Sequence, residues 1–137
     1  MKWAALIAWV VTAGGGFVLL GIWLKNGGMQ RAREQGRRIR PPLLFGHFAL
    51  AATGLVIWIV YLAADKDVLA WIAFAILAVV AALGFTMFAI WLSQRRGVAA
   101  PDPPEQRFPV AIVGLHGVLA ATTLVLVLLT ALKVGGS

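Results

Sequence analysis

The sequence predicts an all-α membrane protein with four transmembrane helices in an up-down bundle. Hydrophobic residues fill 61% of the 137 positions and charged residues only 12%, which is more apolar surface than a soluble domain of this size can bury. Four apolar stretches are each long enough to cross a hydrocarbon core of about 30 Å. They cover residues 3–24, 42–64, 68–92 and 108–132. The connections are too short for a further domain, so residues 1–137 are expected to form one transmembrane domain.

The first stretch has features of a secretory signal peptide, because Lys2 precedes the apolar run and Val11-Thr12-Ala13 has the small residues of a cleavage site. We expect this helix to be retained. The run continues to Leu24, and its tryptophan and glycine positions return 68 residues later in the third stretch.

The second and fourth stretches share the clearest internal repeat of the chain. Both begin near prolines, Pro41 and Pro42 in one and Pro109 in the other, where a helix does not need the missing N–H. The ten residues from His47 and the ten from His116 match at seven positions, which indicates a duplicated hairpin. The repeats are residues 3–64 and 71–132. They are parallel, with a pseudo-two-fold axis along the membrane normal.

The positive charge lies mostly on one side of the predicted bundle. The net charge is +7, and most of it is in the first and third connections, whose basic residues are Lys25, Arg31, Arg33, Arg37, Arg38, Arg40, Arg95, Arg96 and Arg107. The positive-inside rule therefore places these loops in the cytoplasm and both termini outside, in a bacterial inner membrane. No base-stacking aromatic residues alternate with the arginines, so we expect contact with anionic lipid and no nucleic-acid partner.

The only two histidines, His47 and His116, occupy equivalent positions of the repeat and therefore similar depths in the membrane. An imidazole in hydrocarbon needs a partner and should face the bundle interior. A single histidine would usually be explained by a hydrogen bond that helps helix packing. Two at matched depth favour joint binding of one ligand.

Haem iron suits this pair better than a bare metal ion. Zinc needs about four protein ligands, and the chain has no cysteine and carries its acids in loops, at Glu34, Asp65, Asp67, Asp102 and Glu105. Haem iron takes only two axial ligands from the protein. Diagonal helices of a square bundle, about 11–14 Å apart, leave room for such a pair.

The surroundings of the histidines favour a flat cofactor. Small residues follow each histidine on its own helix face, namely Ala51 and Gly54 after His47, and Ala120 and Thr123 after His116. Glycines 14–16 and Gly84 allow close approach of the other helices, although small residues also promote helix packing. Haem propionates could bond to arginines at the cytoplasmic boundary, with lipid as the competing partner. These arginines are Arg38, Arg40 and Arg107.

With His47 and His116 on two helices, the chain resembles the membrane-bound b-type cytochromes built as four-helix bundles, whose haem is held by histidines from two helices. The resemblance implies a haem b with these two axial ligands. It also implies electron transfer to or from a quinone or a partner redox protein. Many members of that class have two histidine pairs, whereas this chain has one, which argues against a complete transmembrane electron path.

Three other functions compete with electron transfer. A non-redox anchor or assembly subunit of a larger respiratory complex would use the histidines only for helix packing. Transport is disfavoured because no carboxylate or lysine lies in the middle of a predicted span, and hydrolytic chemistry because no acid lies beside either histidine. Homo-oligomerisation stays open. Several aromatic residues are interpreted as anchors in the lipid headgroup region, namely Trp23, Trp91, Trp3 or Trp71, Trp58 and Tyr61.

Overall fold

The computed structural model describes residues 1–97 and 103–134 and confirms an all-helical fold with four long apolar helices. Their bounds are Lys2–Lys25 (α1), Pro41–Ala64 (α2), Asp67–Arg95 (α3) and Val110–Ala131 (α4), and a short 3-10 helix, Pro104–Arg107 (η1), precedes α4. Each of the four long helices is long and apolar enough to cross a membrane. Of the acids that the sequence places in loops, Asp102 lies outside the described residues.

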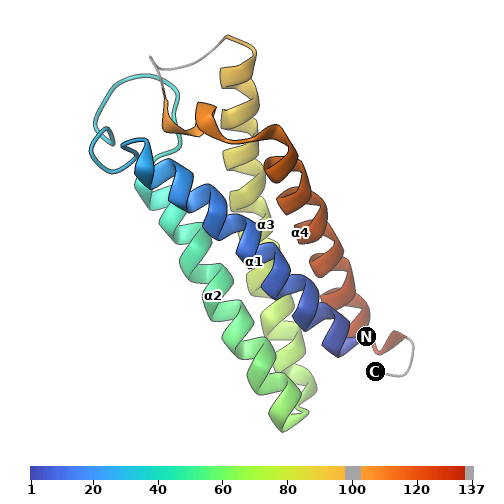
Figure 1. Ribbon diagram of the computed structural model, residues 1–137. Helices are drawn as coiled ribbons and strands as arrows, with labels where there is room; N and C mark the ends of the chain where they lie inside the picture. Colours follow the sequence, from blue (N-terminus) through green and yellow to red (C-terminus); the bar gives the residue numbers. More distant parts are fainter. Residues whose placement is uncertain (98–102, 135–137) are drawn as a thin grey trace.

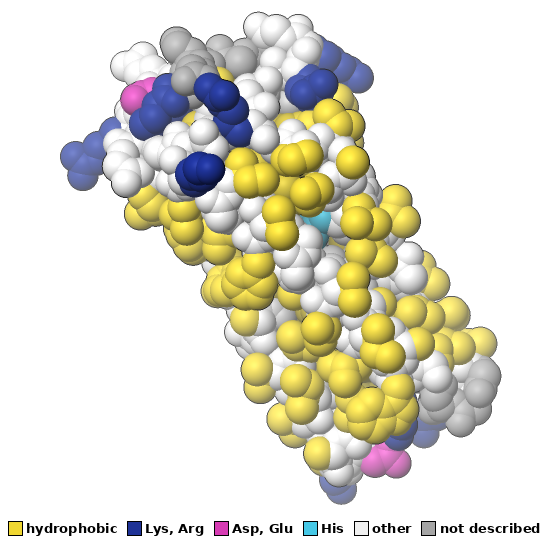
Figure 2. All heavy atoms as spheres, viewed as in Figure 1, with side chains coloured by type: hydrophobic (Ala, Val, Ile, Leu, Met, Phe, Trp, Pro, Cys, Tyr) yellow, Lys and Arg dark blue, Asp and Glu magenta, His cyan; other side chains and the backbone are white. Residues whose placement is uncertain are grey.

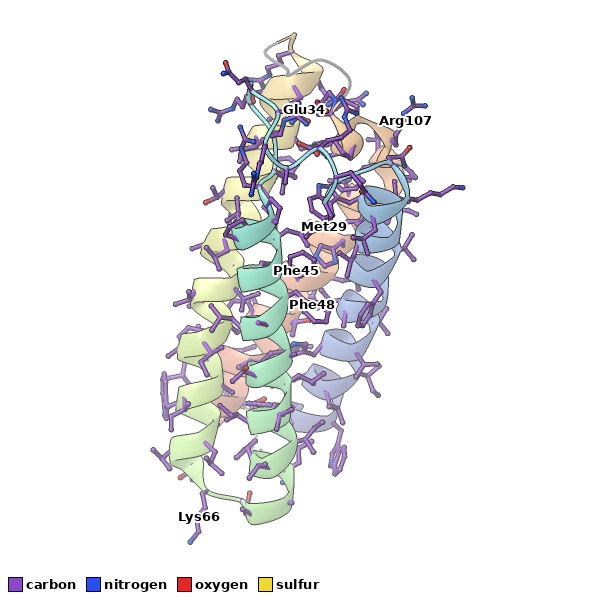
Figure 3. All side chains as sticks on the ribbon, turned by 90° about the vertical axis from the view of Figure 1, so that its left-hand side faces the viewer. Met29, Glu34, Phe45, Phe48, Lys66 and Arg107 are labelled. Atoms are coloured by element: carbon purple, nitrogen blue, oxygen red, sulfur yellow. The ribbon has the colours of Figure 1, made fainter. Side chains whose placement is uncertain are left out.

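The helices run alternately up and down (Figure 1). Helix α2 packs along α3 and α1 along α4, while α3–α4 and α1–α2 complete the square; the pairs α1–α3 and α2–α4 are diagonal. The start of α1 and the end of α4 lie at the end of the bundle that also holds the tight α2–α3 turn. Lys66 marks that turn in Figure 3, whereas Glu34 and Arg107 lie at the opposite end. Basic side chains gather at this opposite end, and apolar side chains cover the surface between the two ends (Figure 2).

Burial follows the sequence repeat. Ala5 of α1 and Ala73 of α3, 68 residues apart, are both fully buried, and so are Trp58 of α2 and Val127 of α4, 69 residues apart. Large apolar side chains such as Phe85, 73% exposed, face outward, as expected for helices surrounded by lipid. The duplicated hairpin is therefore visible in the packing, and it places equivalent residues of the two repeats against the same interior.

The interpretation of four aromatic residues as headgroup anchors was wrong. Trp23, Trp58, Tyr61 and Trp91 are at most 6% exposed and lie within the protein. Trp58 and Tyr61 pack together with ring centroids 4.8 Å apart, and the Trp58 indole donates a hydrogen bond to the carbonyl of Lys2. Loop segments and neighbouring helices cover these rings, which sequence position alone did not indicate.

Candidate functional site

His47 and His116 face each other across the bundle. They come from the diagonal helices α2 and α4, in the half nearer the basic end, and their ring centroids are 6.3 Å apart with ring planes at 67°. Two imidazoles bound on opposite sides of one metal, with metal–nitrogen bonds of about 2 Å, would have centroids about 6 Å apart. The separation therefore fits a pair of axial ligands.

Each imidazole is held by a backbone carbonyl of the other hairpin. His47 Nδ1 lies 3.0 Å from the carbonyl oxygen of Val80 on α3, and His116 Nδ1 lies 2.9 Å from that of Thr12 on α1. Because a carbonyl can only accept, Nδ1 carries the proton in both rings. In the neutral imidazole, Nε2 then keeps a free lone pair. This is the usual arrangement of a metal-ligating histidine, whose second nitrogen donates to a carbonyl or carboxylate.

Glycines on the second diagonal pair of helices lie against the two rings. A Cβ atom added at Gly16 of α1 would be 3.1 Å from His116 Cε1, and one at Gly84 of α3 would be 3.2 Å from His47 Cε1. Gly15 also approaches His116, whereas a Cβ at Gly14 would meet nothing within 4 Å. Two of the glycines that the sequence singled out therefore make close room for the imidazoles.

The hydrogen-bond acceptors of the two histidines and the glycines that contact them follow the pseudo-two-fold symmetry. The accepting carbonyls belong to Thr12 and Val80, and the contacting glycines are Gly16 and Gly84. Members of each pair are 68 residues apart, just as the helices that carry them are related by the repeat. The two halves of the site are therefore built from equivalent positions of the sequence repeat.

The small residues after the histidines have mixed surroundings. Ala51 packs against the main core cluster and Ala120 is half-buried. At Gly54 a Cβ would meet the Trp9 indole at 2.9 Å and Ile76 at 3.2 Å, so a neighbouring side chain already fills that space. The Thr123 hydroxyl donates to the carbonyl of Leu119 and lies 3.2 Å from the Thr12 hydroxyl. Gly54 and Thr123 thus pack against other side chains.

The three predicted arginines differ in what they contact. Both terminal nitrogens of Arg40 bond to loop carbonyls, those of Ala32, Glu34 and Gly36. Arg38 is 5% exposed and bonds through one terminal nitrogen to Glu34 and Gln35, while its Nε is buried without a partner among the residues that the structure describes. Arg107 ends η1 at the same end of the bundle (Figure 3). Of the three, Arg38 has a buried donor still to be satisfied.

A buried polar cluster, which the sequence did not predict, lies at the basic end of the bundle. Glu105 of η1 is fully buried, and its Oε1 accepts from the backbone N–H of Ile39 at 2.7 Å and from Gln94 Nε2 at 2.6 Å. Gln94 also donates to the carbonyl of Arg37 and accepts from Gln106. These bonds join α3, η1 and the α1–α2 connection. Glu105 was interpreted only as a loop acid, and no local pattern marks it as buried.

Aromatic side chains cover one flank of the histidine site. Phe48 meets Phe17 edge to face at 5.4 Å and Phe45 meets Trp23 at 6.1 Å, between α2 and α1; Figure 3 shows both phenylalanines on the side of α2 that faces α1. The equivalent positions on α4 are glycines 114 and 117, where an added Cβ would meet nothing within 4 Å. A histidine side chain is visible from outside in Figure 2. Aromatic side chains therefore cover the flank of the site between α1 and α2, whereas the equivalent positions on α4 have no side chain to cover the other flank.

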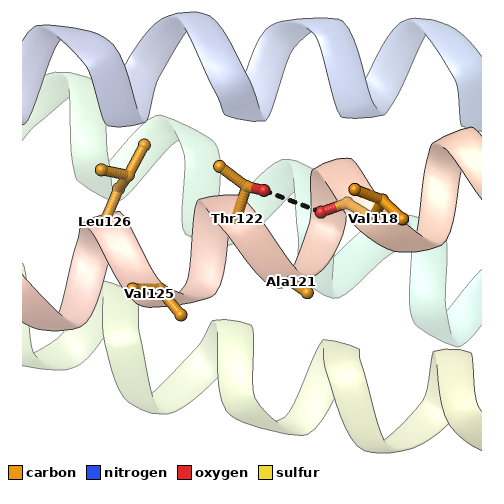
Figure 4. A pocket seen from close by; sticks show the side chains of 5 residues that line it. All are labelled: Val118, Ala121, Thr122, Val125 and Leu126. Carbon is orange, nitrogen blue, oxygen red and sulfur yellow. Dashed lines mark hydrogen bonds between the residues drawn. The ribbon is translucent and has the colours of Figure 1, made fainter.

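A shallow hollow of about 390 Å³ on α4 is not part of this site. Figure 4 shows its lining side chains, Val118, Ala121, Thr122, Val125 and Leu126. The only polar group among them, the Thr122 hydroxyl, donates to the carbonyl of Val118 on its own helix. Nearly all of the lining is exposed and apolar, so the hollow is suited to lipid chains.

The described residues offer too few ligands for a bare metal ion. Within residues 1–97 and 103–134, no group of three or more His, Cys, Asp or Glu side chains is placed to share an ion. The donor set is two imidazole nitrogens, which suits a metal that brings its own equatorial ligands.

The fold and the site define a four-helix membrane protein with a symmetric pair of half-buried histidines. The chain matches no family model, and no curated protein or solved structure matches it. Inferences about function therefore rest on the geometry of this site.

Proposed function

We propose that the protein is a membrane-embedded b-type cytochrome that binds one haem between His47 and His116 and passes electrons to or from a quinone or a partner redox protein. The supporting observation is the 6.3 Å separation of the two rings together with the Nδ1 bond that each ring makes to a carbonyl. A haem bound there supplies one-electron chemistry at its iron.

The protein's own residues have three tasks in this proposal. The carbonyls of Thr12 and Val80 fix each imidazole in the tautomer that presents Nε2, and hydrogen bonding at Nδ1 strengthens the ligand. Gly16 and Gly84 keep the space beside the rings free of side chains. The apolar helices keep water from the iron, and together with the ligand type this environment sets the redox potential.

The orientation belongs to the same proposal. With the basic end in the cytoplasm, the termini and Lys66 lie outside, and the histidines lie in the cytoplasmic half of a bacterial inner membrane. Electrons would then exchange with a quinone or a protein near the inner leaflet, or with a larger respiratory complex to which the chain belongs.

A non-redox role in anchoring or assembly is the second candidate, and one observation favours it. The bonds from His47 to Val80 and from His116 to Thr12 already satisfy one nitrogen of each ring and tie the two hairpins together. Interhelical hydrogen bonds of this kind stabilise membrane proteins without any cofactor. In that case the purified protein folds without haem.

Optical spectra separate the two candidates. The protein is expressed with ample haem, purified in detergent, and recorded oxidised and dithionite-reduced. We expect sharp reduced α and Soret bands in the unmodified protein, and their loss or strong weakening in His47→Ala and His116→Ala. Thr53→Ala is the matched control, because its exposed hydroxyl bonds only to its own helix. A folded protein with no haem bands would reject the cytochrome proposal in favour of the anchor.

A further inference from the structure

Two tryptophans at the basic end hold buried indole N–H groups that have no hydrogen-bond partner within residues 1–97 and 103–134. Trp23 of α1 is 1% exposed and Trp91 of α3 is 6% exposed, and the Nε1 atom of each is buried and unpaired in this part of the chain. A buried donor left unpaired is costly and rare in folded proteins. The two residues are also equivalent in the repeat, being 68 positions apart, so the same unusual feature occurs twice.

Their register links them to the histidine site. Trp23 lies seven residues after Gly16, and Trp91 lies seven residues after Gly84, so each tryptophan shares a helix face with the glycine that touches an imidazole. Seven residues advance a helix by about 10 Å. Both indoles are therefore displaced by about two turns from the level of the histidines toward the basic end.

The indole of Trp23 is tightly enclosed. Gly28, just after α1, packs so closely on the Trp23 ring that an added Cβ would overlap it, and Phe45 covers the ring edge to face. The Trp91 ring is covered by Arg95, whose guanidinium carbon lies 5.2 Å from the ring centroid, and by Phe88. These contacts are to ring faces and edges, so none of them supplies a hydrogen-bond acceptor to the indole N–H.

We propose that Trp23 and Trp91 each donate a hydrogen bond to one of the two carboxylates of the bound haem, with the buried Nε of Arg38 as a further donor. This inference rests on the proposed function. A haem carries both carboxylates on one edge of the macrocycle. An ionised carboxylate accepts several hydrogen bonds, and those to charged groups are the stronger ones.

The arrangement of the helices can supply hydrogen-bond donors to both carboxylates. The histidines come from one diagonal, α2 and α4, and the tryptophans come from the other, α1 and α3. A plane perpendicular to the line between the two imidazoles points its edges toward α1 and α3. One indole donor then lies near each of these two opposite edges, both displaced toward the basic end. The proposal thus fixes the orientation of the haem, with its carboxylate edge toward the basic loops.

A chemical double-mutant cycle tests the two bonds. The haem-free, full-length protein in detergent is titrated with protohaem and with its dimethyl ester, whose neutral ester groups accept hydrogen bonds more weakly. Trp23→Phe and Trp91→Phe keep an aromatic ring and remove the N–H. Each should weaken protohaem binding about tenfold, the factor expected for one hydrogen bond to a charged group, and leave binding of the ester nearly unchanged. Trp71→Phe, at the other end of α3 and 42% exposed, is the matched control.

Resonance Raman spectra supply a second measurement that does not depend on affinity. The propionate bending band of the loaded protein should shift in each tryptophan variant and stay in place in Trp71→Phe. A band that is unmoved in both variants, or an equal loss of affinity for protohaem and ester, overturns the inference and leaves the cytochrome proposal standing. Failure of the unmodified protein to bind either porphyrin rejects both.

Discussion

The Nδ1 atom of His116 lies 2.9 Å from the carbonyl oxygen of Thr12, so a residue of the last helix is held by the backbone of the first. The equivalent bond joins His47 to Val80. Each histidine is thereby fixed by the opposite hairpin, and neither hairpin alone contains a complete half-site. Orientation of both imidazoles therefore depends on assembly of the whole bundle, which connects the fold directly to the proposed chemistry.

Valine at the contacting glycines should disable the site. In Gly16→Val or Gly84→Val, a side chain would enter space within 3.1–3.2 Å of an imidazole carbon and push the ring off its carbonyl. Overpacking of this kind costs about 1–3 kcal/mol, so haem affinity should fall about tenfold or more. The measurement is haem titration followed at the Soret band.

Gly14→Val is the matched control, since a Cβ at Gly14 meets nothing within 4 Å. It should bind haem as the unmodified protein does. Equal affinity in all three variants would show that the glycines are unrelated to the histidine site.

Gly54 should prove to be a packing residue. Gly54→Ala places a methyl group 2.9 Å from Trp9 Cζ2 and 3.2 Å from Ile76 Cγ2, and overpacking should destabilise the bundle by about 1–3 kcal/mol. Gly21→Ala, where an added Cβ meets nothing, should be neutral or stabilise by up to about 1 kcal/mol through helix propensity. Unfolding of the two variants in mixed micelles measures the difference. The same stability in both would contradict the contact with Trp9.

Glu105 should stabilise the basic end of the bundle. Glu105→Ala leaves the N–H of Ile39 and the amide of Gln94 without their acceptor, and each buried unpaired donor costs about 1–3 kcal/mol. Glu105→Gln keeps an oxygen in the same place and should lose less. Thr86→Ala is the comparison, because that hydroxyl is exposed and donates only to the carbonyl of Ala82 on its own helix, and surface substitutions of this kind change stability by less than about 0.5 kcal/mol. The prediction fails when Glu105→Ala and Thr86→Ala unfold alike.

The absence of cysteine from the sequence makes the orientation easy to measure. Lys66 and Arg33 are each replaced by cysteine in a separate variant. Both variants are treated with a maleimide that does not cross membranes. In intact spheroplasts Lys66→Cys should react at once, and Arg33→Cys should react only after the membrane is permeabilised. The reverse pattern would place the basic end outside and move the histidines to the other half of the bilayer.

The sequence was sufficient to predict the helices and the meeting of the histidines. Apolar runs set the four spans to within a few residues, and the repeat required His47 and His116 to lie at one depth on related helices. Their facing geometry follows from symmetry, which explains why two residues far apart in the chain could be paired without knowledge of the structure.

The remaining features depend on tertiary contacts, which cannot be predicted from the residue types alone. The acceptors of the histidines are backbone carbonyls, which any residue at positions 12 and 80 would supply. The space beside Gly54 is occupied by the Trp9 indole, whereas the equivalent pair in the second repeat is Leu77 and Thr123. Trp23, Trp91 and Glu105 are buried through tertiary contacts such as that of Gly28 with the Trp23 ring and that of Ile39 with Glu105, which hydropathy does not reveal.

Electron paramagnetic resonance of the oxidised, purified protein tests the central claim most directly, because the spin state of ferric haem reports its axial ligands. The proposal predicts one haem per chain with the low-spin signal of two imidazoles, and conversion to a high-spin signal or loss of haem in both His47→Ala and His116→Ala. A high-spin signal in the unmodified protein, or a low-spin signal that survives either substitution, would contradict ligation of one iron by these two residues.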